Sequence, residues 1–88
     1  MVTWKIVYTK QAIKDSQKIL SSGLKPKVEK LIIILAENPY KNPPPFEKLV
    51  GKLQGAISRR INIKHRLVYQ VLEDVKTVKI IRMWTHYE

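Results

Sequence analysis

The residues best suited to chemistry lie in the stretch 58–69, where cationic and apolar side chains alternate. The stretch is expected to form two strands joined by a tight turn, and successive side chains of a strand point to opposite faces. If the apolar residues of both strands are buried together, Arg60 lies directly opposite Arg66, because a one-residue slip would turn one set to water. Two arginines so placed repel each other, so an anion should lie over them. The spacing therefore predicts an anion site, and an ordinary solvated sheet face is the alternative.

The same register sorts the other side chains of the two strands. Ser58 and Val68 share the face of the two arginines, whereas Arg59 has the parity of the apolar face. The residues expected on the apolar face are Ile57, Ile61, Leu67, Tyr69 and Val71.

A strand and a helix are expected at the start of the chain. Residues 4–8 form a β-branched and aromatic run that is typical of a strand. A helix is expected at residues 10–21, because Thr9 can cap its start and Gly23 stands where a helix would stop. Its apolar residues are expected to fall on one stripe, which comprises Ala12, Ile13, Ile19 and Leu20.

A second helix is expected from Pro26 to the dipeptide Asn38-Pro39, since proline suits the first turn of a helix and disfavours helix just before it. The apolar residues at helical spacing in this segment are Val28, Leu31, Ile32 and Leu35. Residues 39–45 hold four prolines, which predict a stiff extended connector into the sheet.

The last strand is expected at residues 77–86, after a turn near Glu73 and Asp74. Alternation would place Ile80, Arg82, Trp84 and His86 on one face. The other face would hold Ile81, Met83 and Thr85. One strand, two helices and three strands in series predict a single α+β domain over residues 1–88, with an antiparallel sheet of about four strands and both N-terminal helices on one side.

The composition points to a polyanionic partner. Lysine and arginine number 17 against 7 aspartates and glutamates, which gives a formal net charge of +10. Such an excess is typical of proteins that bind nucleic acid. The sequence lacks cysteine and has two histidines, so neither a metal site nor another cofactor is expected. No apolar stretch is long enough to span a bilayer, and we expect a cytoplasmic protein without membrane contact.

Four short motifs occur in order along the chain: Glu47-x-Leu49, Ser58-Arg59-Arg60-Ile61, His65-Arg66-Leu67-Val68-Tyr69 and His86-Tyr87. With these motifs and the expected order of elements, the sequence resembles the YoeB/Txe toxins of the RelE superfamily over nearly its full length. The resemblance implies a ribosome-dependent endoribonuclease that cuts mRNA in the decoding site, beside the 16S rRNA, and so inhibits translation. It also implies an inhibiting antitoxin of the YefM/Phd type, through which alone the toxin would meet operator DNA, and it leaves a homodimer open.

The resemblance assigns roles to four residues of a metal-free cleavage that yields a 2′,3′-cyclic phosphate. Glu47 matches the family's general base and His86 its general acid. Arg66 matches the residue that stabilises the extra negative charge, and Tyr87 matches a terminal tyrosine that orients the substrate. The residues expected to bind RNA are Arg59, Arg60, Lys52, Lys64, Arg82 and Trp84.

The residues alone are also consistent with simpler structural roles. Glu47 could be a surface carboxylate that pairs with Lys48 or Lys52. Trp84 could fill the core, or it could stack on a base. At the level of function, the alternatives are a non-catalytic toxin that blocks the ribosome or gyrase by binding, and a general basic module for nucleic acid.

Overall fold

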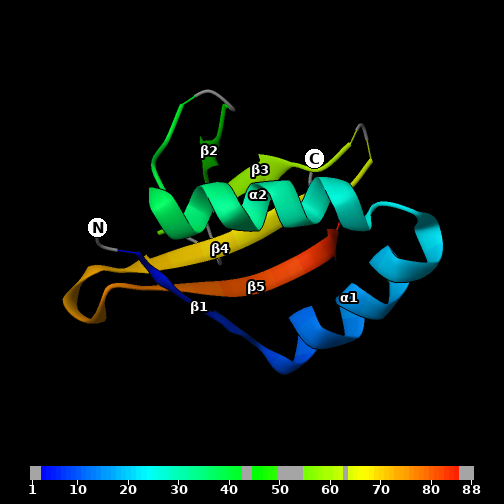
Figure 1. Cartoon of the computed structure of the whole chain (residues 1–88), viewed down its shortest axis with the longest axis horizontal. Helices are drawn as coiled ribbons and strands as arrows, with labels where there is room; N and C mark the ends of the chain where they lie inside the picture. The colour runs from blue at the N-terminus through cyan, green and yellow to red at the C-terminus, as the bar shows by residue number, and fades with distance from the viewer. Residues whose placement is uncertain (1–2, 43–44, 50–54, 63, 86–88) are drawn as a thin grey trace.

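The computed structural model describes residues 3–42, 45–49, 55–62 and 64–85, and the side chains of Trp84 and Thr85 lie outside that description. The described residues form one sheet with both helices against one face (Figure 1). The elements in chain order are β1 (Lys5–Tyr8), α1 (Lys10–Ser22), α2 (Lys25–Glu37), β2 (Glu47–Lys48), β3 (Ala56–Arg60), β4 (Arg66–Leu72), the single 3₁₀ turn η2 (Glu73–Val75) and β5 (Thr77–Thr85).

Both helices begin and end within one residue of the predicted positions. The Thr9 hydroxyl accepts a hydrogen bond from the backbone N–H of Ala12 at 3.0 Å, and Gly23 ends α1 with φ at +79°, a conformation that glycine adopts without steric cost. Pro26 lies in the first turn of α2, and Asn38 follows its last residue. The residues of α2 that are fully buried are Val28, Leu31 and Leu35.

The predicted stripe of α1 is partly wrong. Ala12 and Ile19 are buried, but Ile13 is 52% exposed and Leu20 is 59% exposed. The third fully buried side chain of α1 is Asp15, which continues the line of Ala12 and Ile19 at helical spacing. A charged residue therefore takes a core position, which a pattern of apolar residues alone cannot indicate.

The sheet is mixed, with strand order β1-β5-β4-β3-β2. Its α+β class and its helices on one side confirm the prediction, but it has five described strands where about four were expected, and β1 runs parallel to β5. The extra strand is β2, whose two residues are too few to show alternation in a sequence. The relative direction of β1 and β5 could not be predicted from the sequence either, because side-chain alternation is the same in parallel and antiparallel strands.

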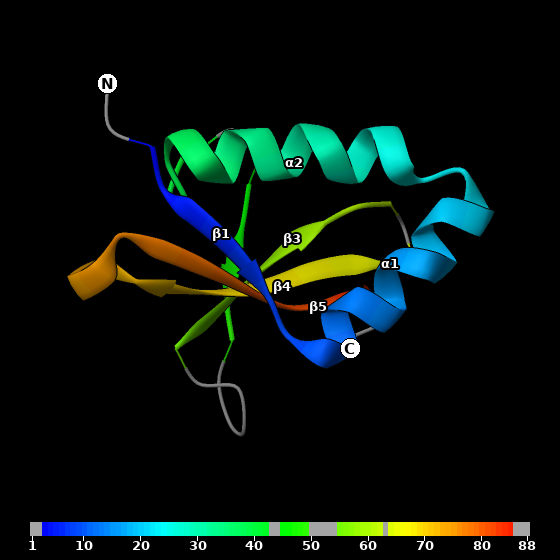
Figure 2. The ribbon, with the colours of Figure 1, turned by 60° about the horizontal axis from the view of Figure 1, so that its bottom comes forward.

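The central hairpin has the predicted register. Arg60 pairs with Arg66 and Ile57 pairs with Tyr69 across β3 and β4. Asn62 shapes the turn, because its side-chain oxygen accepts hydrogen bonds from two backbone N–H groups that follow it. The apolar set belongs to the core that both helices share, and Figure 2 shows α2 lying over the sheet. The face of the arginines is therefore the one away from the core.

The predicted faces of the last strand are wrong for Ile80 and Arg82, which were expected to share a face, while the side chain of Trp84 and residue His86 lie outside the description. Tyr69 pairs with Ile80 and Val68 pairs with Arg82, so β5 carries one extra residue, Ile81, between these two pairs. Paired residues share a face, so Ile80 lies with the core and Arg82 lies on the opposite face, that of the paired arginines. Such a bulge reverses the alternation of a strand, and no residue in this part of the sequence marks it.

Candidate functional site

A pocket of about 220 Å³ opens on the sheet face opposite the helices, over β2, β3 and β4. Its described lining consists of Pro45, Phe46, Glu47, Ser58, Arg60 and Arg66. Four of these residues, Glu47, Ser58 and the two arginines, belong to the motifs that the sequence singled out. The pairing of short strands thus gathers side chains from three separate segments into one site.

Glu47 and Arg66 form an ion pair in this pocket. A terminal nitrogen of Arg66 donates to one carboxylate oxygen of Glu47 at 3.2 Å. The side chain of Glu47 is 68% exposed and that of Arg66 is 19% exposed, so the carboxylate stays open to solvent while the guanidinium is partly enclosed. The glutamate therefore faces Arg66 rather than the neighbouring Lys48, which points to the other face of β2.

The electrostatics of the pocket favour an anion. Arg60 is exposed and pairs directly with Arg66 across the two strands. Among the described lining residues, two guanidiniums thus face the single carboxylate of Glu47, and the cationic charge exceeds the anionic charge. A phosphate between the arginines would relieve their mutual repulsion.

Ser58 is a polar residue of the pocket to which sequence reasoning gave no role. It pairs with Glu47 on one side and with Val68 on the other, so its side chain points to the same face as theirs. The residue is 1% exposed, and among the described residues its hydroxyl has no hydrogen-bond partner. The sequence did contain a signal for it, because strand alternation places Ser58 on the same face as the two arginines.

Arg59 lies inside the molecule and not in the pocket. It is 1% exposed, and its guanidinium donates to the Tyr69 hydroxyl at 3.0 Å and to the backbone carbonyl oxygens of Pro39 and Lys41 at 3.1 and 2.8 Å. The guanidinium also stacks on Phe46, 5.0 Å from the ring centroid. The expectation that Arg59 binds RNA does not fit a side chain enclosed in this way, so we leave it out of the proposed interface.

The contacts of Arg59 instead anchor the connector that leads to Glu47. Tyr69 completes the anchor, because its hydroxyl donates to the Pro39 carbonyl at 2.7 Å. Burial raises the pKa of Tyr69, although the nearby Arg59 lowers it, so the phenol keeps the proton that it donates. Arg59 thus joins the start of the connector to Phe46, the residue before the glutamate.

Of the other predicted site residues, only Arg82 and Lys64 have described side chains outside the pocket. Arg82 stands on the same sheet face, two strands away from β3, and is engaged by Asp15. Lys64 is exposed in the turn of the hairpin. Trp84 lies within β5, but its side chain is not described, and Lys52, His86 and Tyr87 lie outside the described residues. The structure therefore brings together the base and charge-stabilising candidates, and leaves the acid as a prediction.

Within the described part of the chain, metal-binding clusters and membrane-spanning helices are both absent. No three histidine, aspartate or glutamate side chains there lie close enough together to hold a metal ion. Neither helix in the same ranges is long and apolar enough to cross a membrane.

Comparisons with known proteins identify the family of the chain. The family model of the YoeB-like toxin of bacterial type II toxin–antitoxin systems matches residues 7–87. Toxin YoeB of Streptomyces coelicolor is 38% identical over 61 residues, which span 69% of this chain and 70% of the relative.

Solved structures of similar fold include toxins from Agrobacterium tumefaciens and Staphylococcus aureus. A YoeB/ParE toxin from Agrobacterium tumefaciens is 28% identical, with a TM-score of 0.85 over 94% of this chain and 99% of its own. YoeB of Staphylococcus aureus is 31% identical over 96% of this chain and 98% of its own, with TM-scores of 0.79 in a YoeB–YefM complex and 0.80 in a YoeB dimer. Family model, relatives and fold agree, and the chain belongs to the YoeB-like toxins of bacterial type II toxin–antitoxin systems.

Proposed function

We propose that this toxin is a ribosome-dependent endoribonuclease that cleaves mRNA in the decoding site and so inhibits translation. The observation that carries the proposal is the ion pair of Glu47 and Arg66 in a pocket that Arg60 also lines. A carboxylate repels RNA, so a protein that merely binds a polyanion is better without one at the centre of its cationic site. Its presence beside two guanidiniums favours a catalytic role over a purely binding one.

In the proposed reaction, Glu47 takes the proton of a ribose 2′-hydroxyl. The 2′-oxygen then attacks the adjacent phosphorus, and the bond from phosphorus to the 5′-oxygen of the next nucleotide breaks. His86 gives its proton to that departing oxygen, so the products carry a 2′,3′-cyclic phosphate and a 5′-hydroxyl. Arg66 and Arg60 stabilise the charge that develops on the phosphoryl oxygens, and Tyr87 orients the substrate. The step as written uses no metal ion and no cofactor.

The message would be held by cations around this pocket. Arg60 is the last residue of β3, Lys64 lies in the turn between β3 and β4, and both are exposed. Lys52, Arg82 and Trp84 remain predicted contacts, with Trp84 as a stacking platform for a base. Contacts of this kind with the message and the 16S rRNA agree with the net charge of +10.

The same charge suggests how the toxin is restrained. YoeB of Staphylococcus aureus has been solved in complex with YefM and also as a dimer. By analogy, we propose that an antitoxin of the YefM/Phd type covers the cationic face of this toxin with an acidic segment, that operator DNA is met only through that complex, and that the toxin can form a homodimer. Its site of action would be the cytoplasm, where its ribosomal target lies.

Cleavage of a defined message on purified, programmed ribosomes tests the proposal, with Glu47→Gln as the first variant. This change keeps the size of the side chain and removes the base, so we expect the cleavage rate to fall by about 10²–10⁴-fold. Binding to the ribosome should be kept, because the variant is more cationic than the natural protein. Cuts should lie at fixed positions within codons and leave cyclic phosphate ends in the reaction with the natural protein.

Glu37→Gln is the matched control, because it removes the same charge from the exposed end of α2. It should cleave at the natural rate. An intact message with the natural toxin, together with arrested translation, would show that the protein blocks the ribosome by binding alone. Equal cleavage of free RNA would instead remove the ribosome from the mechanism.

A further inference from the structure

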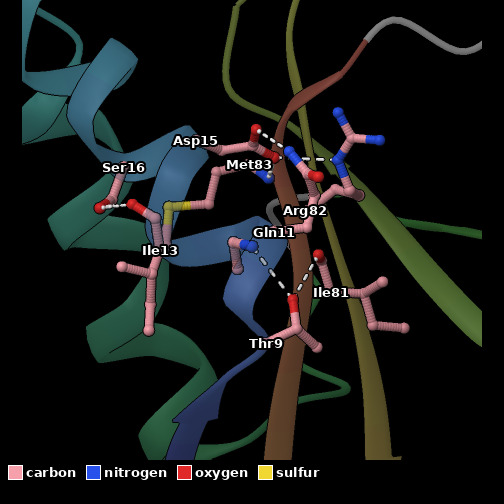
Figure 3. Close-up of polar contacts among 9 residues, drawn as sticks. Thr9, Gln11, Ile13, Asp15, Ser16, Ile81, Arg82 and Met83 are labelled. Carbon is pink, nitrogen blue, oxygen red and sulfur yellow. Dashed lines mark hydrogen bonds and ion pairs between the residues drawn. The ribbon is translucent and has the colours of Figure 1, made fainter.

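Helix α1 takes the place of an edge strand along the last part of β5. Strand β1 pairs with β5 only as far as Ile80, which lies opposite the last residue of β1. Beyond this point, the backbone N–H of Thr9 donates to the Ile80 carbonyl at 3.0 Å, and the Thr9 hydroxyl donates to the Ile81 carbonyl at 2.9 Å. The backbone N–H of Met83 donates to a carboxylate oxygen of Asp15 at 3.1 Å (Figure 3). The bulged part of β5 is thereby held by α1.

These contacts of Thr9 and Asp15 with β5 form a clamp, and Asp15 is its central residue. Its carboxylate is fully buried, and the oxygen that accepts from Met83 also accepts from Nε of Arg82 at 2.9 Å. The other oxygen accepts from the Gln11 side chain at 3.1 Å. An ion at a core position is costly unless it is paired and hydrogen-bonded, and replacing such a pair with apolar residues is often neutral or stabilising. Packing alone therefore gives no reason for an aspartate here.

The bulge determines where Arg82 points. It puts Arg82 in a row that crosses the sheet through Val68 and Ser58 to Glu47, all on the face of the pocket. Neighbouring strands are about 4.8 Å apart, so the backbone of Arg82 lies about 14 Å from that of Glu47 along this row. The Arg82 side chain is 34% exposed, and Figure 3 shows its terminal nitrogens pointing away from α1.

We propose that Asp15 is a positioning residue for RNA binding. It holds the bulge of β5 by accepting from Met83, and it fixes the guanidinium of Arg82 by accepting from Nε. The remaining nitrogens of Arg82 are thereby presented to a phosphate of the message that flanks the scissile one. This inference rests on the proposed function, because it assigns a second phosphate contact to the same RNA.

The proposal predicts a change in KM opposite to the one that the change in charge alone would cause. Asp15→Asn makes the toxin more cationic, which by itself would strengthen RNA binding. Loss of the clamp should instead raise KM for cleavage of message on programmed ribosomes by about tenfold, with kcat changed less than twofold. A contact that is the same in the ground state and the transition state affects KM and leaves kcat unchanged. Asp74→Asn is the matched control, since it removes the same charge from an exposed turn, and its KM should not rise above the natural value.

A double-mutant cycle tests whether Asp15 acts through Arg82. Arg82→Gln should raise KM as much as Asp15→Asn, and the double variant should be no worse than either single one. Arg82→Lys keeps the charge but removes the Nε–H that Asp15 accepts and the guanidinium that this contact orients, so it should also raise KM about tenfold. A natural KM in Arg82→Lys would overturn the proposal even if Asp15→Asn failed to fold, and so would additive effects in the double variant.

A measurement without RNA separates this inference from the proposed function. In NMR spectra of the free toxin, the Met83 amide and the Arg82 Nε–H should exchange slowly with solvent in the natural protein and in Asp74→Asn. Both should exchange at least tenfold faster in Asp15→Asn. Rapid exchange of Arg82 Nε–H in the natural protein would overturn the clamp. If exchange is slow as expected but the natural toxin leaves the message intact, the proposed function fails, and the RNA-binding role of Asp15 fails with it.

Discussion

Replacing Arg66 by alanine is expected to lower the rate of message cleavage by about 10²–10³-fold and to leave the fold intact. In the proposed mechanism, Arg66 stabilises the charge that develops on the phosphoryl oxygens, and it also holds the Glu47 carboxylate through their 3.2 Å contact. Its removal leaves no buried charge without a partner, because the side chain of Glu47 is 68% exposed and can be solvated. The effect should therefore appear in the rate and not in the stability.

Lys48→Ala is the matched control for this experiment. Lys48 is exposed, adjoins Glu47 in β2 and lies on the other face of the strand, so the variant loses the same charge outside the pocket. Its rate should stay within about twofold of the natural one. Single-turnover cleavage on programmed ribosomes measures both variants, and circular dichroism checks their fold. A folded Arg66→Ala protein that cleaves at the natural rate would contradict the assigned role.

The largest expected effect on stability comes from Arg59→Ala, which should lower the free energy of unfolding by about 3 kcal/mol. The guanidinium of Arg59 fills a buried site, and its loss would leave a cavity beside Phe46 and two backbone carbonyls with fewer donors. The Pro39 carbonyl would keep the hydrogen bond from Tyr69, which limits the loss. Because this network holds the connector before Glu47, cleavage by the variant should also weaken.

The adjacent arginine provides the control. Arg60→Ala changes the same chemical group one residue further along β3, where the side chain is exposed. Its free energy of unfolding should stay within about 0.5 kcal/mol of the natural value, while its cleavage rate falls. Urea unfolding followed by tryptophan fluorescence measures both proteins. Equal stability of the two variants would show that the buried contacts of Arg59 contribute little.

These two neighbouring arginines show what the alternation of side chains along a strand can and cannot predict. Strand alternation places Arg59 with the apolar face and Arg60 with the open face, and the structure agrees with both. Parity alone could not show that a cation on the buried side would find partners. Those partners, at Pro39 and Lys41, come from a connector about twenty residues away in the chain, so only the packed fold reveals that Arg59 is structural.

Local signals determined much of this protein. The caps of α1, the proline at the start of α2 and the alternation of the hairpin depend on neighbouring residues, and they placed both helices and set Arg60 opposite Arg66. A register follows from the sequence wherever one face must be buried, because a slip would expose the whole apolar set. The family motifs assign Glu47 to the same site, although it lies in another segment of the chain.

Tertiary structure decided the features that depend on contacts between distant segments. The parallel pairing of β1 with β5, the short strand that brings Glu47 to Arg66, and the bulge that turns Arg82 to the face of the pocket all arise where such segments meet. The buried Asp15 belongs with them, because a charge can occupy a core position only when its partners arrive from another element, here Arg82 and Met83 of β5. Periodicity reports which side of an element is covered, and it carries no information about what covers it.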